Sequence, residues 1–438
     1  MELVPISEVR SSKLSGKCDL MQHQIYISSY EFMQKRVVIT GMGIWSCLGT
    51  TLDEVRDSLY AGRSGIVLDP LRKEMGFRSG LTGNVPAPEL KGELPRSQRV
   101  FMPQPAQYAY CATRDALKMA CLEPDFMAAH EVGLLYGNDS TAEAVHRSVQ
   151  TMIEKKDTML CGSGAIFQSM NSTVTMNLGV IFHLRGINLT VSGACASGSH
   201  AIGLGALLIR DGLQDIVVCG GAQEVNPAAT GSFDGIAAFS TREDDPAAAS
   251  RPFDASRDGL VPGGGAATLV LESYESAVSR GATILAEVLG YGFSGNGEHI
   301  STPNVDGPVR ALRAALFSAG MKPSDIGYVN AHATSTLVGD SNEAKALYAV
   351  FGERSVPVTS TKSQTGHEMW MAGASEVVYS LLMMKNGFIA PNLNFETPDE
   401  DSVHLWIPAQ RLEQRFDTFL SNSFGFGGTN SALVIRDV

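Results

Sequence analysis

Residues 188–210 read NLTVSGACASGSHAIGLGALLIR. The first five have the apolar and β-branched pattern of a strand. A glycine-bounded turn that carries Cys195 follows, and small residues continue to the end of the stretch. Small side chains let a helix pack closely against a sheet or a second helix. The stretch therefore predicts a strand, a sharp turn and a central helix, with a cysteine at the turn.

A later stretch repeats this plan. Residues 356–361 predict a strand, residues 364–367 form a turn that ends in His367, and a small-residue helix is predicted from there to Met384. In both units a reactive side chain stands at the turn. The repetition indicates either an internal duplication or a coincidence between two ordinary strand–helix units, and the pattern leaves both open.

Strand-like runs alternate with helix-like segments along the rest of the chain. The strand-like runs are residues 37–40, 132–136, 189–192, 215–219, 267–271, 356–359 and 431–435. Such alternation is typical of a layered α/β fold with largely buried sheets. No low-complexity tract or Ser/Pro-rich linker divides the sequence, so we expect one integrated body.

Composition excludes several classes of protein. Hydrophobic residues make up 44% of the 438 residues, as in a well-buried globular protein, and the net charge of −12 disfavours general nucleic-acid binding. No run approaches the roughly 18 apolar residues of a membrane helix, so no membrane insertion is expected. Seven cysteines without a CxxC pair argue against a disulfide framework or zinc site and favour a reducing, cytoplasmic location.

The first residues of the chain contribute little to these patterns. Residues 1–32 lack the basic and then apolar layout of a signal peptide. Met33 precedes a sequence that passes directly into the strand-like residues 37–40, as a natural start would. We therefore expect residues 1–34 to be an N-terminal extension outside the fold.

Cys195 is the first candidate for chemistry, because it lies where the predicted helix begins. Unsatisfied N–H groups and the helix dipole favour negative charge at such a position, and a thiol pKa there can fall from about 8.5 to between about 3.5 and 7.5. The position predicts a nucleophilic thiolate. The alternative is inert burial. We keep that interpretation for Cys47, Cys111, Cys121, Cys161 and Cys219.

Two histidines stand at comparable turns. His332 follows the strand-like residues 327–330, and His367 ends a turn that is preceded by Lys362. The carboxyl ends of strands are where α/β folds place catalytic groups. A lone histidine is most often structural, but a thiolate needs neighbours that handle protons and charge. A cysteine and two histidines at three such turns therefore favour a catalytic site.

The run SNSFGFGGTN, residues 421–430, places three glycines around Phe426. Such a backbone can approach a ligand and point an N–H group at it, and the alternative is a tight turn before the last strand. Motifs of nucleotide binding, metalloproteases and serine hydrolases are absent from the sequence. Residues 41–43 lack the third glycine of a dinucleotide fingerprint, and the sequence has no phosphate loop, HExxH or GxSxG motif.

Together these segments resemble the β-ketoacyl-acyl-carrier-protein synthases of the thiolase superfamily, most closely the synthase I and II types, from about Lys35 onward. The segments that carry the resemblance are residues 36–43, 194–198, 250–254, 257–259, 332–340, 362–363, 366–367 and 422–430. It implies a five-layer αβαβα fold of two pseudo-twofold βαβαβαββ halves, and a homodimer. The first half, residues 35–285, would carry the cysteine and the second, residues 286–438, the histidines.

The resemblance also implies an acyltransferase of fatty acid or polyene and polyketide-like synthesis. Cys195 would accept an acyl chain from acyl-carrier protein, and the histidines would stabilise the enolate left when malonyl-acyl-carrier protein loses carbon dioxide. Decarboxylation supplies the carbanion, so no cofactor and no metal is implied. The resemblance implies roles for further residues. Phe426, with Gly425 and Gly427, would act as a gate, and its N–H would form the oxyanion hole with the N–H of Cys195. Lys362 and Glu343 would order the histidines, Thr334 and Thr336 would bind pantetheine, and Phe233 would line the acyl pocket.

Two segments depart from the family pattern. Ala333 stands where glycine is usual, and residues 368–371, Glu-Met-Trp-Met, stand where smaller residues are common. The resemblance therefore leaves the preferred acyl chain open. One alternative is a non-catalytic partner subunit like the chain-length factors, which the retained cysteine, histidines and lysine disfavour. Another is a thiolase, but that group uses a second cysteine near the C-terminal glycines, and no cysteine follows Cys219.

Overall fold

The computed structural model describes residues 34–438, so the predicted extension, residues 1–34, lies outside the described residues except for Gln34. The main elements of the first half are β1 (Val37–Trp45), α2 (Leu52–Ala61), α5 (Gln104–Met119), β4 (Val132–Gly137), α7 (Ala142–Lys155), η2 (Thr158–Cys161), α8 (Ala165–Gln168), α9 (Thr173–Ile181), β5 (Asn188–Val191), α10 (Ser197–Arg210), β6 (Ile216–Gln223), α11 (Pro227–Gly235), β7 (Gly265–Ser273) and α12 (Tyr274–Ser279). Those of the second are β8 (Ala286–Gly295), α13 (Asp306–Ala319), β9 (Tyr328–Asn330), α14 (Leu337–Phe351), β10 (Val358–Thr359), α15 (Lys362–Thr365), η5 (Met369–Met371), α16 (Ala372–Asn386), β11 (Thr418–Gly425), η7 (Phe426–Gly428) and β12 (Thr429–Arg436).

The large sheet consists of two five-stranded halves that repeat one topology. The strand order is β1-β7-β6-β4-β5 in the first half and β8-β12-β11-β9-β10 in the second. In both halves the first two neighbouring pairs are antiparallel and the last two are parallel. The halves meet where a short stretch of β1 pairs with β8. The sequence repetition is therefore an internal duplication, not a coincidence.

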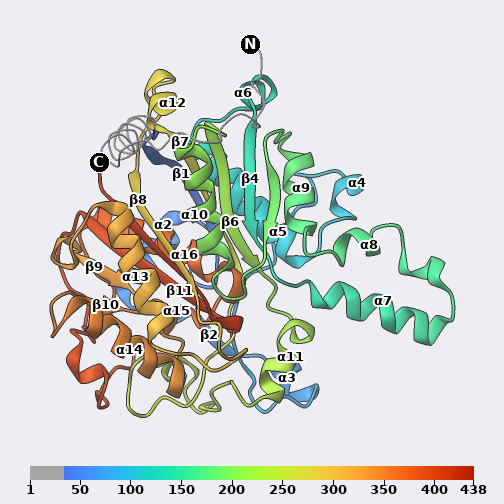
Figure 1. Ribbon diagram of the computed structural model, residues 1–438. Helices are drawn as coiled ribbons and strands as arrows, with labels where there is room; N and C mark the ends of the chain where they lie inside the picture. The colour runs from blue at the N-terminus through green and yellow to red at the C-terminus, as the bar shows by residue number, and fades with distance from the viewer. Residues whose placement is uncertain (1–33) are drawn as a thin grey trace, which may run out of the picture.

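Three layers of helices alternate with the two halves of the sheet (Figure 1). A hydrophobic cluster joins α5 and α9 to the first half, and another joins α13 and α14 to the second. A third cluster surrounds α10 and α16, which lie between the two halves. This is the five-layer αβαβα arrangement that was predicted. The predicted division at residues 285 and 286 stays a prediction, and it falls between α12 and β8.

Glycines in the first strand of each half permit close packing of a helix of the same half. A Cβ on Gly41 or Gly43 would lie 2.3 Å or 2.1 Å from a carbonyl oxygen of α5. A Cβ on Gly290 or Gly292 would lie equally close to carbonyl oxygens of α13, 2.3 Å and 2.1 Å away. The glycine pair at residues 41–43 therefore serves helix–sheet packing. The glycines of β8 also explain why this strand was not predicted, since they weaken the strand pattern.

The central helices begin side by side. A Cβ on Gly373 of α16 would lie 2.5 Å from the backbone nitrogen of Ser199 in α10, so only a glycine allows this approach. Cys195 precedes α10 and His367 precedes α16. The duplication therefore brings the two turns together from opposite halves of the chain. Within residues 34–438, no helix has the length and apolar character needed to cross a membrane.

Candidate active site

One cavity of about 360 Å³ is lined by Cys195, His332 and His367. Phe233 and Phe426 also line it, as do the loop residues Thr334, Thr336 and Glu343. Lys362 is not among the lining residues and is only 1% exposed. The structure thus gathers around one space the residues that the sequence placed on separate turns.

Cys195 lies in a tight turn between β5 and α10. Ala194, just before it, has a φ of +46°, a left-handed conformation that is unfavourable for alanine. The hydroxyl of Ser197 accepts a hydrogen bond from the N–H of Gly193 at 2.9 Å and donates one to the carbonyl of Ala194 at 2.6 Å. These bonds hold the strained turn and fix the cysteine at the start of the helix.

The surroundings of Cys195 oppose the predicted thiolate. Burial raises the pKa of the Cys195 thiol to about 12, although the positive charge of Lys362 acts in the opposite direction. The sequence prediction considered only the helix terminus. In the folded chain Cys195 is 6% exposed, and the loss of water around a thiolate outweighs the nearby charge. Burial therefore favours the protonated thiol in the resting site.

The two imidazoles are perpendicular neighbours. The ring centroids of His332 and His367 are 5.2 Å apart with an interplanar angle of 90°. Burial, together with the charge of Lys362, lowers the pKa of both histidines well below the ordinary value. Both rings are therefore neutral at pH 7. A neutral imidazole has one N–H donor and one acceptor nitrogen, so the pair can donate to an oxygen and can also accept a proton.

Lys362 forms a buried ion pair with Glu376, a residue that the sequence analysis missed. The ammonium at the start of α15 contacts the Glu376 carboxylate on α16, and each side chain is 1% exposed. Burial raises the pKa of Glu376 to about 7, against the effect of Lys362. A sequence signal existed, because Glu376 is an acidic residue within a predicted small and apolar helix. Such a residue needs a partner.

Glu343 contacts the backbone of His332 and not its ring. Its carboxylate accepts the backbone N–H of His332 at 2.8 Å and a hydrogen bond from the side-chain amide of Asn422. Burial raises the pKa of Glu343 to about 8. Glu343 thereby links α14 to the histidine loop and to β11.

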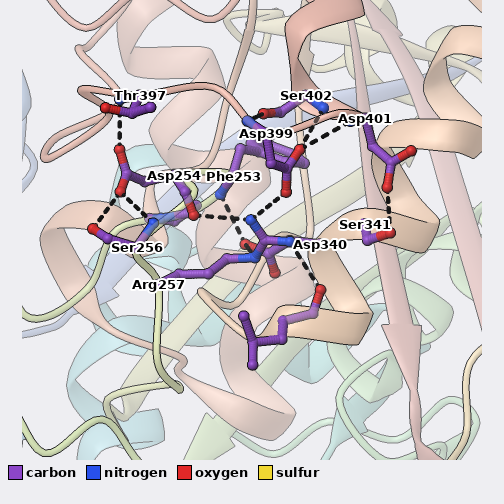
Figure 2. A network of polar contacts seen from close by, with 12 residues as sticks. Phe253, Asp254, Ser256, Arg257, Asp340, Ser341, Thr397, Asp399, Asp401 and Ser402 are labelled. Carbon is purple, nitrogen blue, oxygen red and sulfur yellow. Dashed lines mark hydrogen bonds and ion pairs between the residues drawn. The ribbon is translucent and has the colours of Figure 1, made fainter.

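A second carboxylate orders the loop after His332 (Figure 2). Asp340 accepts backbone N–H groups from Thr334, Thr336 and Phe253, at 3.0, 3.2 and 2.9 Å. Arg257 donates to the Thr336 carbonyl at 3.0 Å and to the Asp399 carboxylate at 2.6 Å. The loop that carries both threonines is therefore fixed by charged groups. The Thr334 and Thr336 hydroxyls are 3.1 Å apart at the cavity wall.

Phe426 lies at the opening of the cavity. Its side chain is 43% exposed, and its ring stacks on Phe233 with centroids 6.0 Å apart and an interplanar angle of 16°. The predicted glycine-rich turn is shorter than expected, because β11 and β12 pair up to Gly425 and Thr429. Only η7 turns, with Gly427 at a φ of +78°. The aromatic ring therefore lies on a short turn at the end of a hairpin.

The residues that depart from the family pattern also lie near the nucleophile. Met369 and Trp370 join Cys195, Phe239 and Leu260 in one hydrophobic cluster. Glu368 is buried and accepts hydrogen bonds from the Ser375 and Tyr379 hydroxyls of α16, the latter at 2.8 Å. Met369 and Trp370 therefore pack in the cluster that contains Cys195, whereas Glu368 is held against α16.

The buried carboxylates make stability depend on pH. Burial raises the pKa of Glu343 and of Glu368 to about 8, far above the ordinary value. The folded chain keeps these protons where the unfolded chain has released them, so stability is lost as the pH rises toward 8. Histidines with lowered pKa values make the free energy of unfolding rise with pH, but only below about pH 6.5. We expect the free energy of unfolding to fall between about pH 6.5 and 8.5, by on the order of 1 kcal/mol per pH unit and carboxyl.

Denaturant unfolding at several pH values measures this slope. Glu368→Gln serves as the matched variant, because glutamine occupies a similar volume and does not titrate. Its slope over this pH range should be smaller than that of the unchanged chain by about 1 kcal/mol per pH unit, because Glu343, and Glu376 below about pH 7, still contribute. A slope that is the same in both proteins would show that Glu368 ionises normally.

Family models and relatives agree with this architecture. The N-terminal domain model of β-ketoacyl synthases matches residues 34–277, and the C-terminal domain model matches residues 285–396. The chain is 38% identical to 3-oxoacyl-[acyl-carrier-protein] synthase 1 of Escherichia coli and 39% identical to that of Haemophilus influenzae. Each alignment covers 92% of this chain and 99% of the relative.

Solved structures of ketosynthases share this fold. A β-ketoacyl synthase from Burkholderia phymatum superposes with a TM-score of 0.88 at 38% identity, over 92% of this chain and 100% of that one. The ishigamide ketosynthase/chain length factor superposes with a TM-score of 0.85 at 31% identity and the same coverage. Fold and cavity thus define a condensing enzyme of the thiolase type. The chain belongs to the β-ketoacyl synthase family, as its motifs predicted.

Proposed function

We propose that this chain is a 3-oxoacyl-acyl-carrier-protein synthase, which joins an acyl group to a two-carbon unit from malonyl-acyl-carrier protein. The observation that carries the proposal is that Cys195, His332 and His367 line one cavity in a member of this family. A thiol nucleophile and two neutral imidazoles are the groups that a decarboxylative Claisen condensation requires.

The first step transfers the acyl chain. The Cys195 sulfur attacks the thioester carbonyl of acyl-carrier protein, a new carbon–sulfur bond forms, and the carrier thiol leaves. Because the resting thiol is protonated, its proton must move as the sulfur attacks. The acceptor nitrogen of a neutral imidazole in the same cavity receives this proton and returns it to the departing carrier thiolate.

The second step forms the carbon–carbon bond. Malonyl-acyl-carrier protein loses carbon dioxide, and the electron pair of the broken bond passes into an enolate. N–H groups of His332 and His367 donate to the enolate oxygen, which neutral rings can do at pH 7. The enolate carbon attacks the acyl carbonyl on Cys195. The cysteine thiolate then leaves and takes a proton, and the 3-oxoacyl product carries two more carbons.

The remaining residues bind and position the substrate. The N–H groups of Cys195 and Phe426 form the oxyanion hole of the tetrahedral intermediate, a device whose single donors are worth about 10²–10³ in rate in other enzymes. Gly425 and Gly427 let the Phe426 ring move as a gate. Thr334 and Thr336 bind the pantetheine arm, and Phe233 contacts the acyl chain. Lys362 and Glu343 act as positioning residues for the two histidines.

Intact-mass spectrometry with a panel of acyl-carrier-protein thioesters tests the proposal. We expect a covalent adduct with the mass of the acyl group, mapped by peptide analysis to Cys195, and a 3-oxoacyl product once malonyl-acyl-carrier protein is added. The chain lengths that form adducts also give the acyl preference. An unmodified Cys195 with every thioester would favour the alternative of a non-catalytic, chain-length-factor-like subunit.

We also propose that the chain forms a homodimer in the cytoplasm. β5 is the last strand of the large sheet, and Leu189 on it is 54% exposed. The arm of α7, η2 and α8 projects from the body on the same half (Figure 1). Its exposed apolar side chains are Val145, Val149, Met152, Ile153, Met159, Leu160, Ile166 and Phe167. A second copy would cover this surface, and the six described cysteines are free, as in a reducing compartment.

Light scattering after size-exclusion chromatography checks the assembly. We expect twice the mass of the 46.7 kDa chain. Leu189→Lys should shift the species toward monomer, because it places a charge on the exposed edge. Phe317→Lys, on α13 of the second half, provides a control at an exposed apolar side chain far along the sheet from β5. A monomeric unchanged chain would contradict the proposal.

A further inference from the structure

His200 connects the two segments that frame the nucleophile. It lies on α10, five residues after Cys195, and both of its ring nitrogens have partners. Nδ1 lies 2.6 Å from the Tyr291 hydroxyl on β8, and Nε2 lies 2.8 Å from the Thr429 hydroxyl at the start of β12. Burial lowers the pKa of His200 to about 4. The ring is therefore neutral at pH 7 and donates to one hydroxyl while it accepts from the other.

Thr429 belongs to the hairpin that carries Phe426. It pairs directly with Gly425 across the end of β11 and β12, and η7 connects the two. A Cβ on Gly425 would lie 2.8 Å from Thr429 Cγ2 and 2.9 Å from the Gly193 carbonyl oxygen. The hairpin end thus packs against the turn that holds Cys195.

The His200 ring packs against that same turn. A Cβ on Gly193 would lie 3.2 Å from Cδ2 of His200. The partner on the other side is also fixed, because the Tyr291 ring packs directly on α10, where a Cβ on Gly203 would lie 2.3 Å from it. His200 therefore links the central helix, the nucleophile turn and the hairpin end through one rigid ring.

We propose that His200 is a positioning residue that, through Thr429, holds the Phe426 backbone N–H at the distance from Cys195 that the oxyanion hole requires. The inference rests on the proposed function and extends it to a residue outside the cavity lining. Catalytic hydrogen bonds are sensitive to position, and a misplacement of about 1 Å can cost about 10²-fold in rate. His332 and His367 lie on other loops, and the hydrogen bonds of the His200 ring go to Tyr291 and Thr429.

The two half-reactions distinguish a positioning role of His200 from a general effect on stability. Acylation of Cys195 uses the oxyanion hole, whereas decarboxylation of malonyl-acyl-carrier protein uses the two catalytic histidines. Thr429→Val keeps the shape of the side chain and removes the hydroxyl, and Thr429→Ser keeps the hydroxyl. We expect Thr429→Val to slow acylation by about 10- to 100-fold, with decarboxylation within about twofold of the unchanged chain. Thr429→Ser should restore acylation to within about threefold.

Two further comparisons sharpen the test. Thr418→Val makes the same substitution at the other end of β11, where Thr418 pairs with Arg436 far from the turn, and should leave both rates unchanged. His200→Gln places an amide near the Nε2 position and should acylate faster than His200→Asn, whose amide lies near Nδ1. Intact-mass time courses measure acylation, and release of carbon dioxide measures decarboxylation.

The outcomes are distinct. Equal loss of both rates in Thr429→Val, or acylation as fast as in the unchanged chain, would overturn the positioning role of His200. Failure of the unchanged chain to acylate with any thioester would overturn the proposed function, and this inference with it.

Discussion

Cys195→Ala is expected to abolish condensation and leave the fold intact. Removal of the sulfur takes away the only atom to which the acyl chain is proposed to attach, so the rate should fall by a factor on the order of 10⁴ or more. The structural cost is small, because one buried sulfur leaves a void that costs about 1 kcal/mol. Product formation from acyl- and malonyl-acyl-carrier protein measures the rate, and intact mass reports the adduct.

Cys219→Ala is the matched control. Cys219 is a fully buried cysteine on β6, part of the central core cluster and away from the cavity. The same substitution there should lower the free energy of unfolding by a similar or larger amount and leave the adduct and the rate unchanged. An adduct that persists in Cys195→Ala, or that disappears in Cys219→Ala, would show that another group carries the acyl chain.

Lys362→Met should lower both activity and stability. It removes the charge that lowers the pKa of the Cys195 thiol and of both histidines. The thiol then loses its proton less readily, and we expect a rate loss of about 10²-fold or more. The substitution also leaves Glu376 buried without its partner, which typically costs about 3–5 kcal/mol in the free energy of unfolding.

The stability loss should depend on pH. The pKa of Glu376 is already raised to about 7 with Lys362 present, and it rises further without that charge. Near pH 6 the Glu376 carboxyl is protonated and tolerates burial, whereas near pH 8.5 folding must hold the proton or bury the charge. Denaturant titrations should therefore show a larger deficit of Lys362→Met at about pH 8.5 than at about pH 6.

The double variant Lys362→Met/Glu376→Gln separates the two effects. It removes both charges and should recover most of the stability, because no unpaired charge remains in the interior. Its activity should stay low, because the field of Lys362 is still missing. A double variant with restored activity would mean that Lys362 serves stability alone.

Local patterns predicted much of this fold and of the candidate site. The strand, turn and helix unit around Cys195 depends on neighbours in sequence, and it lies in the structure where the sequence indicated. The unit around His367 differs in detail: the strand predicted over residues 356–361 is only β10 (Val358–Thr359), and α15 (Lys362–Thr365) occupies part of the predicted turn. β8 was not predicted, because its glycines weaken the strand pattern in the sequence. The same glycines allow β8 to pack closely against α13. Glu376 was missed although its partner was identified, because an ion pair across α15 and α16 depends on how a turn folds back.

The sequence indicated only one of the two opposing influences on the pKa of the nucleophile. A helix terminus is a local feature and lowers a thiol pKa, but burial is set by distant segments and raises it to about 12 for Cys195. His200 gave no sequence signal at all. Its two partners are on β8 and β12, 91 and 229 residues away along the chain.

Order along the chain was thus enough to establish the duplicated α/β plan, the family and the identity of the reactive side chains, because residue type and near-neighbour spacing carry that information. Only the tertiary structure decided how far apart those side chains lie, how much water they lose and which charge they carry. These properties depend on the packing of α10 against α16 and on the loops around them. Such quantities depend on atoms brought close from both halves, and the solvation of a charged group changes only when those atoms have excluded water from it.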